Sequence, residues 1–450
     1  MNTSEQEGVW KRWFVDRRHV WRRVVIGIAV AIVLVQWTRA ARKPHDGDFF
    51  LHWKFAGRFV AGQMMYAEGL DIPYPPFWGM AWSPTAALPL RAAKTLFYPV
   101  SLASLAVVLF VLNRLTRRHL PLEREPLFWT TVIALALAAR FLVRELPECG
   151  PNLALLALSW LAVYGWSQRR EVMGGACLGF AIALKCTPAL VLAWFAWKRQ
   201  WKMVATTTAA AGAFTLAPAM WQGEGLYAQH VQLWVANVRL SAGNDDPSRG
   251  ALGDEPVQNL ALRPAIARYL MRLPPGHLGR PDHAWYADFL DLPPTMAANV
   301  CKGALLLLLA GVAWTFRQPV ERRHDLAVVW ECACVSVLAL LLSPITWGQH
   351  CVALLPLLYL VSRTAVALRR PPAWAQVVLG FYVIVNLVLN RGLIGRDLTL
   401  LLHSYHLATL SFLGLLVIGL ASRAQAARAA QLLPAPTRQS PPQAPLRRAA

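Results

Sequence analysis

The feature that most constrains this chain is a series of long apolar blocks that hold few or no charged residues. Four of them are Val24–Trp37, Ala304–Phe316, Leu326–Leu342 and Leu407–Leu420. With their flanks, these blocks approach the roughly 17–25 residues that an α-helix needs to cross a bilayer. Charged residues make up 15% of the chain, against roughly 25% in soluble proteins. The sequence therefore predicts an all-α protein that crosses a membrane many times, and it excludes a soluble fold.

The positive charge of the chain follows its membrane topology. The formal net charge is +21, which in a soluble protein would suggest a nucleic-acid partner. Here the basic residues cluster in short connectors, as they do in cytoplasmic loops, and the acidic residues gather in the other loops. The basic connectors are Lys11–Arg23, Arg114–Arg118, Arg169-Arg170, Lys198–Lys202, Arg317–Arg323 and Arg369-Arg370. We therefore expect no nucleic-acid partner, and we expect both chain ends in the cytoplasm.

The alternation of basic and acidic loops predicts about 12 transmembrane helices. The first block counts as a retained helix because no small-residue cleavage site follows it. Basic clusters flank the stretch 172–197 on both sides, so it crosses twice or re-enters, with a break at Lys185–Pro188. The expected crossings are 24–40, 94–113, 127–143, 152–167, 172–197 (twice), 203–220, 300–316, 326–342, 351–367, 374–390 and 400–420.

This topology divides the chain into three regions. Residues 1–23 form a basic cytoplasmic N-terminus, and residues 24–420 form the transmembrane domain, with large outer loops at 41–92 and 221–298. Residues 421–450 are rich in Ala, Pro, Gln and Arg, a composition that predicts a disordered cytoplasmic tail.

The first outer loop contains a candidate amphipathic helix that begins at or near Asp48. Its apolar face would be formed by Phe49, Trp53, Ala56 and Val60, and its basic face by Lys54 and Arg58. Such a helix lies in the membrane interface. Asp48 would then be at the boundary between membrane and water, either as a plain N-cap or as a functional carboxylate. Asp46, two residues earlier, is the competing carboxylate.

Three ionisable residues are predicted at membrane depth, where charge is costly and usually faces a polar cavity. They are Lys185 in the broken stretch, Arg140 near the outer end of a helix, and His350 at the outer start of another. Taken singly, such a residue is often a snorkelling or satisfied side chain. The predicted topology brings Lys185 and His350 to the same face as Asp48, which favours a polar site. The seven cysteines show no metal-ligand spacing, and we expect no metal.

A set of motifs in the expected order carries a resemblance to a known family. In the first loop these are Asp48-Phe49, Gly62 to Tyr66, Tyr74-Pro75-Pro76 and Pro89-Leu90. Further along are Gly150-Pro151-Asn152, Gly179–Pro188 with Lys185, Gln258–Leu262 followed by Arg268, and Ser343–His350, in which Gln349 replaces the family's first histidine. This set resembles glycosyltransferase family 87, the polyprenol-phosphate-mannose-dependent α-(1→2)-mannosyltransferases of the GT-C superfamily.

The resemblance implies a GT-C-like helical bundle and an inverting glycosyltransferase in the cytoplasmic (inner) membrane of a bacterium. A polyprenyl-phosphate sugar, with mannose as the expected sugar, would be the donor, and a glycolipid or glycan on the outer face the acceptor. Asp48 would be the general base, and Lys185, with Arg140 or His350, would hold the phosphate. The other substrate-binding residues implied by the motifs are Tyr74, Asn152, Gln258, Asn259 and Arg268. No cofactor is expected beyond the lipid-linked donor.

Three other functions remain open from the sequence. A transporter or flippase for a lipid-linked sugar would have similar helices, although its fold would favour internal repeats, and none is evident here. A lipid-linked glycan ligase or polymerase would also carry large outer loops. The substitution at Gln349 keeps open a non-catalytic relative that acts as an assembly partner.

Overall fold

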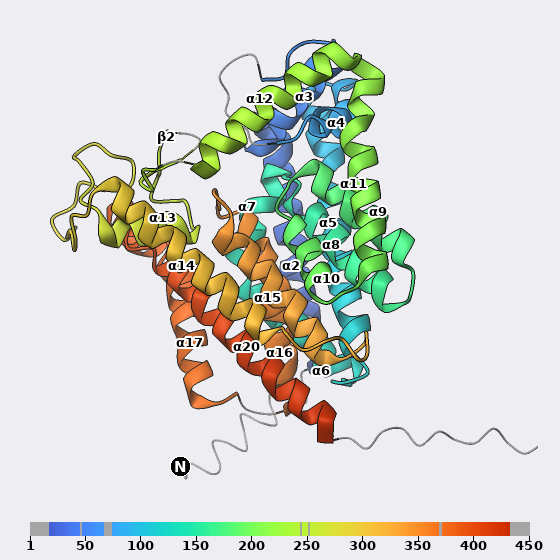
Figure 1. The fold of residues 1–450 in the computed structure, drawn as a ribbon. Helices are drawn as coiled ribbons and strands as arrows, with labels where there is room; N and C mark the ends of the chain where they lie inside the picture. Colours follow the sequence, from blue (N-terminus) through green and yellow to red (C-terminus); the bar gives the residue numbers. More distant parts are fainter. Residues whose placement is uncertain are drawn as a thin grey trace, which may run out of the picture.

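The computed structural model describes residues 18–45, 47–66, 74–243, 245–250, 253–368 and 371–432. Most of these residues are helical (Figure 1), and the two short strands β1 (Arg249–Gly250) and β2 (Gly253–Asp254) pair antiparallel in the segment 221–298. Several predictions fall outside the described residues. They concern most of the basic N-terminus, Asp46, the Arg369-Arg370 connector and the tail from residue 433.

Six of the described helices are long and apolar enough to cross a membrane, which makes this a multi-pass membrane protein. They are α2 (Arg18–Arg42), α5 (Leu90–Thr116), α11 (Trp201–Gln222), α14 (Pro294–Thr315), α16 (Leu355–Leu368) with the 3₁₀ turn η1 (His350–Leu354) before it, and α20 (Leu407–Leu432). Shorter apolar helices are α8 (Asn152–Ser167), α9 (Glu171–Leu184), α15 (Leu326–Leu342) and α17 (Ala373–Val383) with the π-turn η2 (Ile384–Val388). The count of twelve crossings stays a prediction.

The helices are arranged so that the two large loops gather toward one end of the bundle. Figure 1 shows α3 (Asp48–Val60), α4 (Phe77–Ala86) and α12 (Glu224–Gly243) at the top, and the end of α20 at the bottom. Helix α13 (Leu262–Leu270) and the hairpin lie in the upper half of the same view, and the short helices α18 (Arg391–Ile394) and α19 (Arg396–Ser404) precede α20. Helices α5, α8, α9 and α11 pack in sequence on one side, and α15, α17 and α20 on the other.

The crossing predicted over 127–143 is not one straight helix, and whether it spans the membrane stays a prediction. The chain forms α6 (Arg124–Leu137) and α7 (Ala139–Glu148), which are bent by 73° at Ala138. Helix α7 carries Arg140, Arg144, Glu145 and Glu148 within nine residues, so it cannot continue straight through an apolar layer without burying several charges. The bend turns this charged helix away from the direction of α6.

The helix that follows Asp48 forms as predicted, and its predicted apolar face is only partly buried within the protein. Its buried residues are Phe49, His52, Phe55, Ala56 and Phe59. Trp53 is half-buried and Val60 is 48% exposed. Helix α3 packs against α4, so its buried face contacts the protein itself. A position of α3 in the membrane interface stays a prediction.

The broken stretch lies where the sequence predicts it. Helix α9 ends at Leu184, α10 (Ala189–Trp197) begins after Pro188, and Lys185 between them is extended. Other described parts of the chain depart from prediction. Helix α12 occupies 20 residues of a segment predicted as loop, and α20 continues to Leu432 although a disordered tail was predicted from residue 421.

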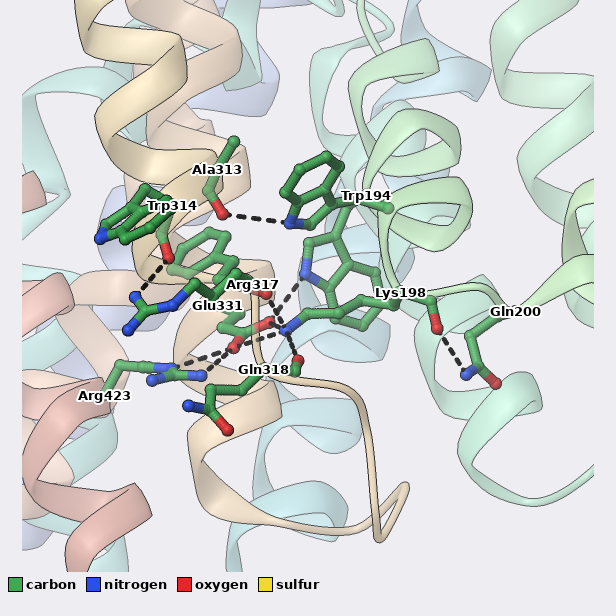
Figure 2. A network of polar contacts seen from close by, with 11 residues as sticks. Trp194, Lys198, Gln200, Ala313, Trp314, Arg317, Gln318, Glu331 and Arg423 are labelled. Carbon is green, nitrogen blue, oxygen red and sulfur yellow. Dashed lines mark hydrogen bonds and ion pairs between the residues drawn. The ribbon is translucent and has the colours of Figure 1, made fainter.

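A buried ion cluster ties together three elements of the lower half (Figure 2). The carboxylate of Glu331 in α15 accepts hydrogen bonds from Trp194 at 3.0 Å and from Lys198 at 3.0 Å. Arg423 of α20 binds the same carboxylate at 2.9 Å. Since Glu331 is 1% exposed and Lys198 is 4% exposed, each charge depends on its partners for stability.

Replacement of Glu331 by alanine is expected to destabilise the fold. The change leaves Lys198 and Arg423 buried without their shared carboxylate, a defect worth roughly 3–5 kcal/mol. The thermal midpoint of unfolding in detergent measures the effect. Glu321→Ala is the control, because Glu321 is exposed in the connector before α15. Equal midpoints for the two variants would contradict the role given to Glu331.

The charge pattern of the sequence predicts on which side of the membrane each loop lies. Ala284, exposed in the loop predicted to lie outside, should after Ala284→Cys react with a membrane-impermeant maleimide added outside intact cells. Gln168, exposed between α8 and α9, should after Gln168→Cys react only in opened membranes. Labelling of the parent protein, whose Cys186 is exposed, is subtracted. Reaction of both positions from the same side would refute the topology.

Candidate active site

Asp48 lies at the first turn of α3, shortly after the end of α2. Gly47, directly before it, has φ +83°, and a Cβ there would lie 2.7 Å from Cγ of Glu148. Gly47 is the N-cap of the helix, and no side-chain cap bond is present. The half-buried carboxylate of Asp48 instead accepts a hydrogen bond from Gln349 Nε2 at 3.3 Å. Asp48 is therefore aimed at the segment that precedes η1.

Lys185 is the centre of a second group, built from four separate parts of the chain. Its Nζ lies 3.2 Å from His350 Nε2 and 3.4 Å from Asn152 Oδ1. The same ammonium lies 5.6 Å from the centre of the Tyr74 ring. The break between α9 and α10 makes this possible, because Lys185 leaves the helix there. Four of the residues predicted from sequence thus meet at one point.

The segment Gln349-His350 connects the two groups. Gln349 contacts Asp48, and the next residue contacts Lys185. The backbone N–H of Trp347 donates to His350 Nδ1 at 3.2 Å, which fixes the orientation of the ring. Gln349 is 5% exposed, and its Oε1 has no hydrogen-bond partner among the described residues. The carboxylate of Asp48 and the ammonium of Lys185 are therefore held against two neighbouring residues of one short segment.

Glu145 is a site residue that the sequence analysis missed. It is fully buried, and its carboxylate accepts bonds from the backbone N–H and the side-chain amide of Asn152, both at 2.9 Å. These two bonds leave Oδ1 of Asn152 facing Lys185. Gly150 makes room for the carboxylate, since a Cβ there would lie 2.7 Å from Glu145 Oε2. In the motif Gly150-Pro151-Asn152, the glycine thus leaves space for the carboxylate that orients the asparagine toward Lys185.

A substitution at Gly150 is expected to disturb this support. Gly150→Ala would press a methyl group on Glu145 and displace Asn152, so we expect transferase activity to fall at least about ten-fold and the thermal midpoint to decrease. Gly57→Ala is the matched control, since a Cβ at Gly57 has no atom within 4 Å. An activity of the Gly150 variant equal to that of the control would show that Asn152 needs no such support.

An open groove extends from the Lys185 group between α8, α10 and α15. It contains about 630 Å³ of empty space and has Asn152, Lys185 and His350 in its wall. The remaining wall is mostly apolar, with a few hydroxyl groups. Its apolar members include Leu155, Leu156, Val191, Val335, Ala339 and Leu340. A ligand with a charged end and a long hydrocarbon chain matches this combination.

The outer-loop residues of the predicted site lie apart from Lys185. Asn259 is fully buried and binds Glu255 at 2.8 Å, Pro344 O at 3.0 Å and Thr346 N at 2.9 Å. Both polar atoms of its side chain have protein partners, so it anchors the loop before His350. Gln258, its neighbour, is exposed. Burial raises the pKa of the Glu255 carboxyl, which suits a role inside the loop.

The two remaining predicted cations also lie outside the Lys185 group. Arg268 is 2% exposed, with its guanidinium 4.0 Å from the centre of the Tyr286 ring and 5.1 Å from that of Tyr405. Arg140 lies 2.9 Å from His403 Nε2 and lines a different cavity. No group of three or more His, Cys, Asp or Glu side chains suited to a metal occurs in the described part of the chain.

Comparison with known proteins identifies the family. Residues 73–344 match the model of glycosyltransferase family 87. The chain belongs to glycosyltransferase family 87. It is therefore a glycosyltransferase, and its apolar helices make it a membrane enzyme. Tyr74, Asn152 and Lys185 lie within the matched residues, whereas Asp48 and His350 lie outside them.

Two curated relatives carry the same name, polyprenol-phosphate-mannose-dependent alpha-(1-2)-phosphatidylinositol mannoside mannosyltransferase. The protein of Mycolicibacterium smegmatis is 28% identical over 374 residues, which cover 79% of this chain and 78% of the relative. The protein of Mycobacterium tuberculosis is 26% identical over 368 residues, which cover 77% of each chain. No solved structure shows a significant match.

Proposed function

We propose that this family 87 enzyme transfers mannose, with inversion, from a polyprenyl phosphate to a glycolipid or glycan at the outer face of the bacterial inner membrane. The names of both relatives support the donor and suggest a phosphatidylinositol mannoside as acceptor. The main support for the proposal is a pair of contacts with two neighbouring residues. The Asp48 carboxylate contacts Gln349, and the Lys185 ammonium contacts His350.

The donor phosphate is proposed to bind between Lys185 and His350. The Lys185 ammonium and His350 Nε2 lie 3.2 Å apart, and both residues line the open groove. A phosphate oxygen accepts a charge-assisted bond from the ammonium and a second bond from the imidazole when its Nε2 carries the proton, and the apolar groove takes the polyprenyl chain.

Asp48 is proposed to act as the general base. Its carboxylate removes the proton from the acceptor hydroxyl, whose oxygen forms a bond to C1 of the sugar. The bond from C1 to the phosphate oxygen breaks, and the polyprenyl phosphate leaves with the electron pair. One direct displacement inverts the configuration. The departing phosphate needs no proton, because cations stabilise its charge.

Two neighbours would keep Asp48 ready for this step. Gln349 donates to one carboxylate oxygen and leaves the other for the acceptor. A glutamine carries no transferable proton, so it orients the base and does not compete with it. Burial and the charges of Asp48 and Glu145 raise the pKa of the Tyr74 hydroxyl. Tyr74 therefore stays a neutral group near the sugar.

Two of the alternative functions are less well supported. A flippase needs no base, and membership of a glycosyltransferase family argues against transport alone. A non-catalytic relative has no need to keep Lys185, Asn152 and the buried Glu145 in contact. Both termini are proposed to lie in the cytoplasm, on the side opposite the site.

The proposal predicts a severe loss of transfer in Asp48→Asn. The amide is nearly isosteric but cannot accept a proton, so turnover should fall at least about 10²-fold. Transfer of labelled mannose from a synthetic polyprenyl-phosphate donor measures the effect. Asp46→Asn, which removes the competing carboxylate two residues earlier, is the control and should be mild. A normal rate for Asp48→Asn would remove Asp48 from the chemistry.

A further inference from the structure

The segment between α13 and α14, residues 271–293, carries large apolar side chains that the rest of the described protein leaves uncovered. Trp285 is 71% exposed, and Phe289 and Leu290 are each more than half exposed. We call these three residues the loop patch. A cluster of uncovered apolar side chains of this size usually marks a surface that binds a partner or a membrane.

The backbone that carries the loop patch is fixed by two other parts of the chain. Arg268 of α13 donates a hydrogen bond to the carbonyl of Ala287 at 2.7 Å. The hydroxyl of Tyr405, directly after α19, donates to the carbonyl of Trp285 at 2.8 Å and accepts from the N–H of Ala287 at 3.1 Å. The ring of Phe289 also lies 5.2 Å from that of Tyr269. The patch is therefore held in one orientation with its apolar groups outward.

Helix α14 places the loop patch relative to the membrane. The helix begins at Pro294, shortly after Leu290, and its 22 residues extend about 33 Å, close to the roughly 30 Å of a bilayer's hydrocarbon core. At its far end Trp314 is exposed, and Arg317 donates to the carbonyl of Trp314 at 3.0 Å (Figure 2). Tryptophan and basic residues are typical of a membrane boundary. The start of α14 and the loop patch then lie near the opposite boundary.

The exposed surface of α14 continues the apolar character of the loop patch. Along this helix the exposed apolar side chains include Met296, Val300, Leu306, Leu307 and Trp314. An apolar helix of this length with so many uncovered side chains faces lipid. The chain therefore passes from the loop patch directly into a lipid-facing helix, and lipid is the partner that both surfaces fit.

The charges around the loop patch favour insertion over electrostatic attraction. Arg272 and Arg280 both lie 3.7 Å from the carboxylate of Asp288, so their charge is largely compensated within the segment. Asp282 and Asp291 are exposed and would repel an anionic surface. The apolar side chains are left as the groups that can bind a membrane.

We propose that the loop patch inserts into the lipid boundary at the end of the bundle that holds the candidate site. An indole and a phenyl ring are favoured in this boundary region. The inserted segment leads through α13 to Asn259, which binds Pro344 and Thr346 in the loop before His350. The anchor thus sets the level of that loop relative to the membrane surface.

Site-specific photocrosslinking tests this proposal. The photoreactive amino acid p-benzoylphenylalanine replaces Trp285 in the full-length protein, which is reconstituted in vesicles of phosphatidylethanolamine and phosphatidylglycerol with a trace of tritiated phosphatidylethanolamine. After irradiation, the protein should carry lipid label in an amount similar to that of a second variant with the same replacement at Leu307 of the lipid-facing helix α14.

The matched control carries the photoreactive residue at Asp282, which is exposed in the same segment. A position that carries a charge in the native chain should face water, so we expect at least about ten-fold less lipid label there than at Trp285. Equal labelling at Trp285 and Asp282, or label at Leu307 without label at Trp285, would overturn the inference. Crosslinking of the Trp285 variant to a protein chain in place of lipid would overturn it as well.

Discussion

The cost of placing charge inside a helical membrane bundle organises this structure. Lys185 has its ammonium among Asn152, His350 and the Tyr74 ring, and the break between α9 and α10 exists at the point where that charge must leave a helix. Asn152 in turn depends on Glu145, and Glu145 on the space left by Gly150. At the other end, Glu331 is held between Lys198 and Arg423. Each buried charge fixes elements that are distant in sequence.

The hydrophobic blocks and the broken stretch could be predicted from the sequence because both depend on local composition. The helix over 152–167 and the break at Lys185–Pro188 appear where expected. The bend at Ala138 could not, because it depends on where α7 finds partners for its charges. Helix α12 was not predicted because it lacks a long apolar run. It is attached to the first loop by tertiary contact, since His230 within it accepts a hydrogen bond from the backbone N–H of Met65 at 3.1 Å.

The site shows the same division between local and tertiary information. Motif order was sufficient to select Asp48, Lys185, Asn152, Tyr74 and His350, which the fold assembles into two adjoining groups. It gave no sign that Glu145 supports Asn152, since an acidic residue near a helix end resembles any outer-loop carboxylate. Asn259 and Arg268 also matched motif positions, yet their contacts are with the protein itself. Gln349 departs from the family histidine and still contacts Asp48.

We propose that Asp48 and Lys185 have separate roles, Asp48 toward the acceptor hydroxyl and Lys185 toward the donor phosphate. The most direct test measures the affinity of the purified protein for a polyprenyl-phosphate mannose in the absence of acceptor. Lys185→Ala should weaken this binding by about 2 kcal/mol, the scale of a lost charge-assisted contact, whereas Asp48→Asn should bind the donor as the wild type does. Wild-type affinity in Lys185→Ala, with the loss appearing in Asp48→Asn, would contradict the account.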